Sequence, residues 1–105
     1  MELTLLTVPG CPHAAAFEER LAAALADRPE VVVHRRVISD VHTAALAGMH
    51  GSPTLLVDGI DPFSPLGEPP SVSCRLYRDA AGRVVPAPSV EALRQALAEP
   101  SMPAS

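Results

Sequence analysis

The side chains that can do chemistry in this sequence are few, and two of them are cysteines, Cys11 and Cys74. Beside them stand four histidines and twelve carboxylates, but no lysine, asparagine or tryptophan. Lysine Schiff bases and phosphate-loop lysines are therefore excluded, and two cysteines cannot build a four-cysteine zinc site. What remains is the chemistry of a thiol.

Cys11 is the first candidate nucleophile. We expect a helix to start at Pro12, because the first helical turn needs no amide hydrogen there. A cysteine at the head of a helix meets unpaired backbone amides and the positive end of the helix dipole, which favour the nucleophilic thiolate. His13 is the second candidate catalytic residue, since an imidazole beside the sulfur adds positive charge or exchanges its proton. The alternatives are an inert thiol and an exposed histidine.

Cys74 is a candidate second thiol. If its strand runs back toward the Cys11 end of the sheet, a rise of ~3.4 Å per residue leaves Cys74 roughly 15 Å away. A disulfide needs Cα atoms within ~7 Å. This estimate favours a buried structural cysteine alternating with Leu76. Pairing with Cys11 remains the alternative, because the long loop before Cys74 can shift where its strand begins.

The remaining histidines and aspartates indicate no further site. His34, His42 and His50 have no metal-ligand spacing, and Gly48 interrupts the two turns between the last two. Asp58 and Asp61 flank a turn, where aspartate commonly bonds its own backbone. We predict no metal and no cofactor.

Alternating strands and helices must position these residues. We expect strands over 3–8, 31–38, 52–59, 74–78 and 83–85, with helices over 12–27, 41–48 and 89–98. Asp40 and Ser89 are the expected N-caps. Four prolines and two glycines make 59–72 a loop, and its 14 residues exceed the usual ~4–6, which is typical of a functional or mobile segment.

This order predicts one α/β domain over residues 1–98 and a disordered tail over 99–105. A strand, a crossover helix and a parallel strand come first, and the two later strands extend the same sheet in antiparallel fashion. The result is a mixed four- to five-stranded sheet with helices on both faces.

Charge and hydropathy restrict the partners. The net charge of −4 argues against a nucleic-acid surface, and the basic pair Arg35-Arg36 is best explained as a solvated strand edge. The N-terminus lacks the pattern of a secretory signal, and no apolar run approaches the ~18 residues that span a membrane. We therefore expect a cytoplasmic protein whose thiols are kept reduced. The oligomeric state stays open.

The stretches Val8-Pro9-Gly10-Cys11-Pro12-His13-Ala14 and Gly51-Ser52-Pro53-Thr54 resemble the thioredoxin-like superfamily. The resemblance implies a three-layer sandwich in which Cys11 matches the first cysteine of a Cys-x-x-Cys pair and Pro53 matches a cis-proline beside it. Ala14 replaces the second cysteine, so the chain looks like a monothiol variant that needs an outside thiol or Cys74 to finish the reaction. Pro12, Ser52, Pro53 and Thr54 are the implied substrate-binding residues.

A narrower resemblance rests on three stretches, which are Val8-Pro9-Gly10-Cys11-Pro12, Gly51-Ser52-Pro53-Thr54 and Ser73-Cys74-Arg75-Leu76-Tyr77. It is to small bacterial thioredoxin-like proteins, some of which are described as alkylmercury lyases. Three functions follow as hypotheses. The first is a thiol-disulfide oxidoreductase or thiol transferase that uses Cys11 on a thiol or disulfide, in a protein or a small molecule. The second is mercury or organomercurial handling through Cys11 and Cys74, and the third is a non-catalytic binding module.

Overall fold

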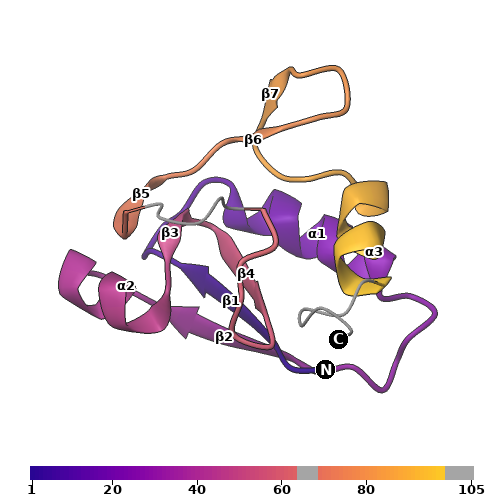
Figure 1. Cartoon of the computed structure of the whole chain (residues 1–105), viewed down its shortest axis with the longest axis horizontal. Helices are drawn as coiled ribbons and strands as arrows, with labels where there is room; N and C mark the ends of the chain where they lie inside the picture. The colour runs from indigo at the N-terminus through magenta and orange to yellow at the C-terminus, as the bar shows by residue number, and fades with distance from the viewer. Residues whose placement is uncertain (64–68, 99–105) are drawn as a thin grey trace, which may run out of the picture.

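A three-stranded sheet lies at the centre of the molecule (Figure 1). The structure, a computed structural model, describes residues 1–63 and 69–98. Strand β1 (Leu3–Thr7) is the middle strand, parallel to β2 (Val33–Val37) and antiparallel to β4 (Thr54–Val57). The helices are α1 (Ala14–Ala24), α2 (Val41–Ala47) and α3 (Val90–Ala98).

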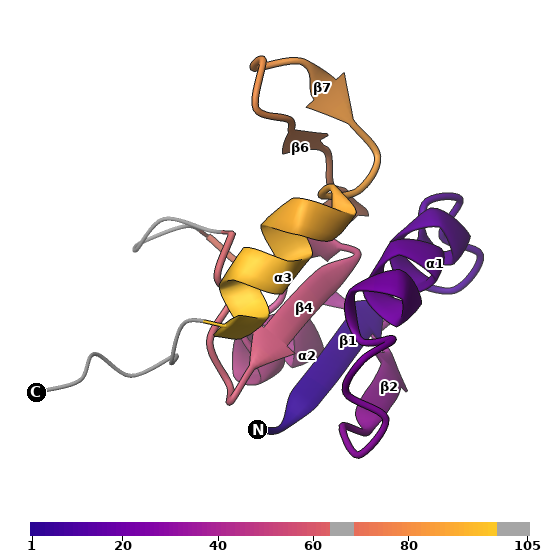
Figure 2. The same cartoon turned by 90° about the vertical axis from the view of Figure 1, so that its right-hand side faces the viewer.

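Helices cover both faces of this sheet, because apolar side chains of β1 point to both sides. Leu3 and Leu5 pack with Phe17 of α1 and Leu93 of α3. Leu6 points the other way and packs with residues of α2 and the segment after it. Figure 2 shows α1 and α3 together on one side, with α2 behind the strands. The predicted α/β class with helices on both faces is confirmed.

The sheet is smaller than predicted. The other four strands of the described residues do not join it and form two separate pairs. β3 (His50–Ser52) pairs in parallel with β5 (Ser71–Cys74). β6 (Tyr77–Arg78) pairs with β7 (Val84–Val85) as an antiparallel hairpin that projects from the body in both views (Figures 1 and 2). The expectation of four to five strands in one sheet, and of one strand over 74–78, is therefore corrected.

The turn after β4 explains why the sheet stops there. The predicted Asp58-Gly59 turn is present, with both residues at positive φ. Val57 and Ile60 then exchange two backbone hydrogen bonds of 2.8 and 3.1 Å. Pro62, two residues further on, has no amide hydrogen with which to continue a ladder along β4. Of the predicted loop over 59–72, residues 64–68 lie outside the described part, as does the predicted tail.

Two of the helices begin where the sequence predicts. The Asp40 carboxylate accepts a 2.8 Å hydrogen bond from Thr43 N, and the Ser89 hydroxyl accepts one of 3.0 Å from Ala92 N. These bonds satisfy amides that a helix start leaves unpaired.

The first helix begins later than predicted. It starts at Ala14, with His13 in the N-cap position, so Pro12 lies in the turn before it. The second strand is also shorter, because only Val33–Val37 pairs with β1. Arg35 and Arg36 are exposed on β2, an edge of the central sheet, which confirms their interpretation as a solvated strand edge.

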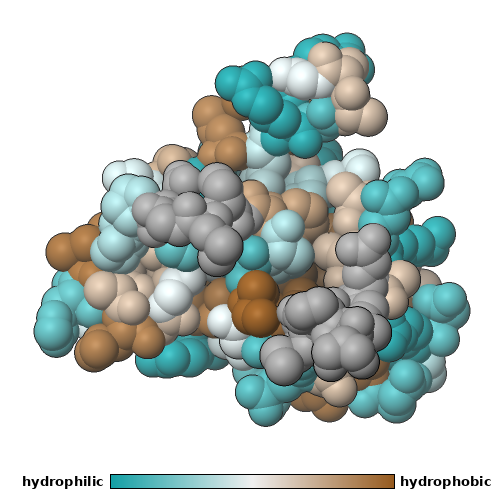
Figure 3. All heavy atoms as spheres, viewed as in Figure 1, coloured by the Kyte–Doolittle hydropathy of each residue, from teal (hydrophilic) through white to brown (hydrophobic). Residues whose placement is uncertain are grey.

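The surface is uneven in character. Figure 3 shows hydrophobic side chains over α2, where Val41 and Leu46 are exposed, and mostly hydrophilic ones around the projecting hairpin. Within residues 1–63 and 69–98, no helix has the length and hydrophobicity needed to cross a membrane.

The pairing of β3 with β5 depends on Gly51. A Cβ atom there would lie 2.8 Å from Arg75 Cβ and 3.2 Å from Ser73 O, and the residue has a φ of +117°. Gly82, in the hairpin turn, also has a positive φ of +81°, but a Cβ there would meet nothing within 4 Å. The two glycines therefore share the backbone requirement and differ in available space.

We predict that Gly51→Ala lowers the free energy of unfolding by about 2–5 kcal/mol, since a positive φ and overpacking both add to the cost. The matched variant Gly82→Ala should lose only about 1–2 kcal/mol, from the backbone alone. Urea unfolding of both variants and the parent chain measures the difference. Equal losses of unfolding free energy in the two variants would contradict a close approach of β5 to β3.

Candidate functional site

Two loops and a strand meet where β1 ends, and Ser52 connects them. Val8 N donates a 3.0 Å hydrogen bond to the Ser52 hydroxyl, which is fully buried. Cys11 N closes a 3.2 Å turn on the Val8 carbonyl. Ser52 is also the partner of Cys74 in the pairing of β3 with β5. The segments that carry the two cysteines are therefore both held on Ser52.

The second thiol lies beside the first helix. Cys74 is exposed, and its Sγ is 3.8 Å from Nδ1 of His13. The expectation of a buried structural cysteine far from the Cys11 end is wrong. That estimate assumed a strand running antiparallel to its predecessor from the opposite end of the sheet. In the structure β5 instead runs parallel to β3, next to the Cys11 loop.

Cys11 is a free, half-buried cysteine in the turn before α1. Its carbonyl accepts a hydrogen bond of 3.4 Å from Ala14 N, the first residue of the helix. Because α1 starts at Ala14, Cys11 precedes the helix by three residues and does not stand in its first turn. Its sulfur is also close enough to Tyr77 for a thiolate there to act on the phenol electrostatically.

The Ser52-Pro53 peptide bond is cis, as the resemblance implied. Ser52, Pro53 and Thr54 are buried, and their polar groups are bonded within the chain. The Ser52 carbonyl accepts from Arg75 N at 2.8 Å, and the Pro53 carbonyl accepts from the Tyr77 hydroxyl. An extended substrate that paired with these groups would have to displace β5. Their predicted part in substrate binding, like that of exposed Pro12, stays a prediction.

The residue after Cys74 forms a buried ion pair that sequence reasoning missed. Arg75 Nη1 is 2.5 Å from Asp61 Oδ2, and the two side chains are only 11% and 4% exposed. The same nitrogen lies 3.3 Å from Thr54 Oγ1, which donates a 2.5 Å bond to the Gly51 carbonyl. Asp61 does form the predicted local turn bond, since its Oδ1 accepts from Phe63 N at 2.9 Å. Its ion pair was missed because Arg75 is 14 residues away and no local pattern links the two.

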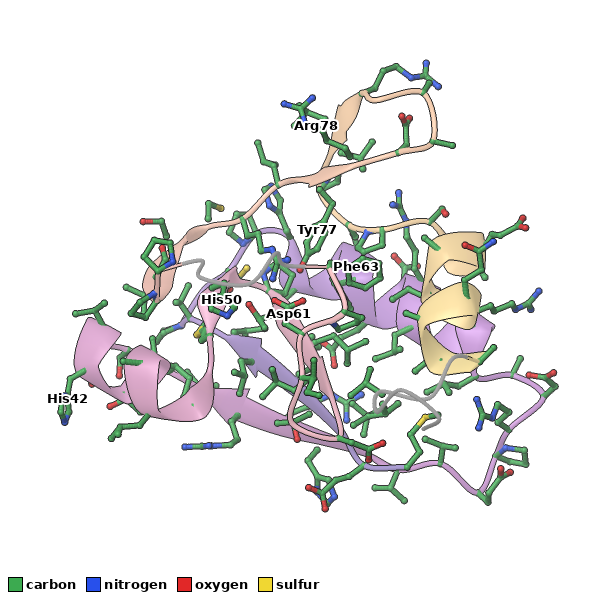
Figure 4. All side chains as sticks on the ribbon, viewed as in Figure 1. His42, His50, Asp61, Phe63, Tyr77 and Arg78 are labelled. Atoms are coloured by element: carbon green, nitrogen blue, oxygen red, sulfur yellow. The ribbon has the colours of Figure 1, made fainter. Side chains whose placement is uncertain are left out.

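The three aromatic residues of the chain form a cluster centred on Tyr77, which lies near Phe63 and Asp61 in Figure 4. The Tyr77 ring lies 5.7 Å from the rings of both Phe17 and Phe63, and the Arg75 guanidinium sits 4.5 Å above it. Such cation–π and edge-on ring contacts are favourable, more so when desolvated. No spacing in the sequence indicates that these three residues share one cluster.

The environment of Tyr77 keeps its hydroxyl protonated. Burial raises the pKa of this phenol well above its ordinary value of 10.0, and the negative charges of Asp61 and Cys11 raise it further. The positive charge of Arg75 acts in the opposite direction but does not outweigh burial. Tyr77 therefore remains a donor to the Pro53 carbonyl throughout the neutral pH range.

The other histidines lie apart from the thiols or make backbone contacts. His42 is at the outer end of α2, and His50 lies nearer the middle of the molecule (Figure 4). Nδ1 of His50 is 3.3 Å from the Pro69 carbonyl. Among the described residues, no three or more histidine, cysteine, aspartate or glutamate side chains are grouped so that they could hold a metal ion.

Comparison of the chain with protein-family models, with curated proteins and with solved structures finds no match.

We predict that Tyr77→Phe lowers the free energy of unfolding by about 1–3 kcal/mol at pH 7, because the buried Pro53 carbonyl loses its donor. The variant should also change the pH dependence. Since the folded-state pKa of Tyr77 is raised, its contribution is complete below the unfolded value near 10.0 and declines at higher pH. Above that pH the free energy of unfolding of the parent chain should fall by up to about 1.4 kcal/mol per pH unit more than that of the variant. Urea unfolding at several alkaline pH values measures this. If the free energy of unfolding falls with pH equally steeply in the variant and the parent chain, a buried Tyr77 phenol is contradicted.

Proposed function

We propose that this chain is a thioredoxin-like thiol-disulfide oxidoreductase or thiol transferase with Cys11 as its nucleophile. One observation carries the proposal: Nδ1 of His13, two residues after Cys11, lies 3.8 Å from Sγ of Cys74. The segment before α1 that carries Cys11 and His13 is thus in contact with a second sulfur, and it is bonded through Val8 to the residue before a cis-proline. Thiol exchange needs a thiolate, an accessible sulfur and a group that handles the proton.

The order of elements supports the thioredoxin-like assignment. β1, α1 and β2 form a parallel crossover unit, and β4 follows antiparallel to β1 directly after the cis-proline. The cysteine loop lies at the carboxyl end of β1 and is bonded through Val8 to the residue before that proline. These features are those that the sequence resemblance implies, although the sheet has fewer strands.

The proposed reaction is an exchange at Cys11. Its thiolate attacks one sulfur of a substrate disulfide, a bond forms between the two sulfurs, and the other substrate sulfur leaves as a thiolate. His13 is placed to exchange a proton with a thiol at this site. In the transferase version, a second thiol from solution attacks the bound sulfur and restores Cys11. Thiol exchange of this kind suits a reducing compartment, so we place the protein in the cytoplasm.

The contacts of β3 favour small substrates over extended peptides. A peptide could recognise β3 by adding a strand to its edge. That edge already accepts hydrogen bonds from β5, since Ser71 N donates to the Met49 carbonyl at 3.1 Å and Arg75 N donates to the Ser52 carbonyl at 2.8 Å. We therefore propose low-molecular-weight thiols and disulfides as the substrate class.

The experiment is reaction of the reduced chain with a chromogenic aryl disulfide at neutral pH. We expect Cys11→Ser to lower the initial rate of aryl thiolate release at least about tenfold, because the proposed nucleophile is gone. Cys74→Ser is the matched control, with the other thiol removed, and should stay within about twofold of the parent rate. An unchanged rate in Cys11→Ser would refute the proposal and favour a binding module that keeps only the fold.

Mercury handling is the second candidate, favoured by the placement of two free thiols on segments held by one serine. Thiolates are preferred ligands of soft metal ions. We predict one tightly bound Hg(II) per chain, with affinity reduced at least about 100-fold in both Cys11→Ser and Cys74→Ser, since each variant removes a ligand. Competition titration against a small dithiol measures this. Full affinity in either variant would exclude a site shared by the two sulfurs.

A further inference from the structure

A monothiol nucleophile leaves one step unexplained, which is how the bound half of the substrate is released. Ala14 stands where a second cysteine of the helix would act. Resting on the proposed function, we infer that Cys74 is the resolving thiol, supplied by strand β5 in place of the helix, and that His13 accepts its proton. The protein would then cycle between a dithiol and an internal Cys11–Cys74 disulfide.

The strand that carries Cys74 is held on both sides of the cysteine. Its first residue, Ser71, donates to the Met49 carbonyl, and Arg75 donates to the Ser52 carbonyl immediately after the cysteine. The Arg75 side chain is fixed in turn by Asp61 and by the ring of Tyr77. The Cys74 side chain is thus exposed, while hydrogen bonds hold the backbone on both sides of it. Its position is therefore set by the fold.

The imidazole that faces Cys74 is free of another structural task. His13 stands at the N-cap of α1 but makes no side-chain capping bond. Its Nδ1 lies 3.8 Å from the Cys74 sulfur, within reach of an S–H···N contact. Because His13 follows Cys11 by two residues, the ring that contacts the proposed resolving thiol belongs to the segment that carries the nucleophile. A group in this place can take the proton from Cys74 as its sulfur attacks.

The reaction balances in two steps. Cys11 thiolate attacks a disulfide R–S–S–R, which releases one R–S⁻ and leaves Cys11–S–S–R. Cys74 then passes its proton to His13 and attacks the Cys11 sulfur, which breaks the bond to R and releases the second R–S⁻. The substrate disulfide is reduced to two thiols, and the protein dithiol is oxidised to one disulfide. Two molecules of a low-molecular-weight thiol from solution, joined to each other as a disulfide, return the protein to its dithiol form.

Substoichiometric aryl disulfide distinguishes resolution from independent reaction of two thiols. With the reduced chain in excess and dilute, resolution releases two aryl thiolates for each reagent molecule and leaves no adduct on the protein. Peptide mapping should then find Cys11 joined to Cys74 within one chain. The variant Cys74→Ser should release one thiolate per reagent and keep the aryl group on Cys11.

Position is tested by moving the thiol one residue along β5. Ser73 is exposed and neighbours Cys74, and the pairing of β5 with β3 shifts register between Ser71 and Cys74. The double variant Ser73→Cys with Cys74→Ser keeps the composition but removes the thiol from the position that contacts His13. We expect it to release one thiolate per reagent. Two thiolates from this variant would mean that any nearby thiol suffices, which would overturn the assignment.

The role of His13 is tested by measuring the rates of the first and the second thiolate release separately. In His13→Gln, the second release should slow at least about tenfold more than the first, because the proton acceptor of Cys74 is lost. Equal slowing of both steps would overturn His13 as the acceptor for Cys74.

The proposed function and this inference fail in different ways. A stable Cys11 adduct in the parent chain, or a disulfide-linked dimer, would overturn Cys74 as the resolving thiol while Cys11 still reacts first. A first step that does not depend on Cys11 would instead refute the proposed function.

Discussion

The buried ion pair of Arg75 and Asp61 is the interaction on which the rest of the site depends. Arg75 bonds Asp61 and Thr54 with its guanidinium, covers the Tyr77 ring, and donates its backbone amide to the Ser52 carbonyl. Removing one partner of a buried pair typically costs about 3–5 kcal/mol, because a charge is left buried alone. That loss is a large part of the 5–15 kcal/mol by which small domains are usually stable. The residue before Arg75 is Cys74, so the same pair that braces the cis-proline loop fixes the second thiol.

Much of what local chemistry determines could be predicted from the sequence. The β1 strand, the Asp40 and Ser89 caps and the Asp-Gly turn each depend on a few neighbouring residues, and all are confirmed. The cis-proline followed from a family resemblance, since X-Pro bonds are mostly trans and local statistics alone would not predict it. The roles of Cys11 and His13 stay predictions, and the expected place of Cys11 at the head of the helix was wrong because α1 begins only at Ala14.

The errors arose where distant residues decide the outcome. Alternation along 74–78 favoured one strand with a buried Cys74, but Arg75 turns inward to Asp61 and leaves Cys74 exposed. Pro62 ends the ladder along β4, so the chain does not return beside it and β5 pairs with β3 instead. No periodicity reports a pairing of Arg75 with a carboxylate 14 residues earlier across a proline-rich loop. A strand register inferred by extrapolation therefore put the second thiol at the wrong end of the sheet.

Placing the two thiols on different elements gives the proposed chemistry a consequence that a Cys-x-x-Cys pair lacks. Two cysteines in one helical turn close a loop of a few residues, which constrains the unfolded chain very little. A bond between Cys11 and Cys74 would close a loop of about 60 residues, for which the chain-entropy model gives ~4 kcal/mol of added stability. It would also tie β5 to the cysteine loop at the point where Ser52 already joins them. Oxidation and stability are then linked: whatever holds β5 against β3, the Arg75–Asp61 pair above all, also favours the internal disulfide over the bound substrate.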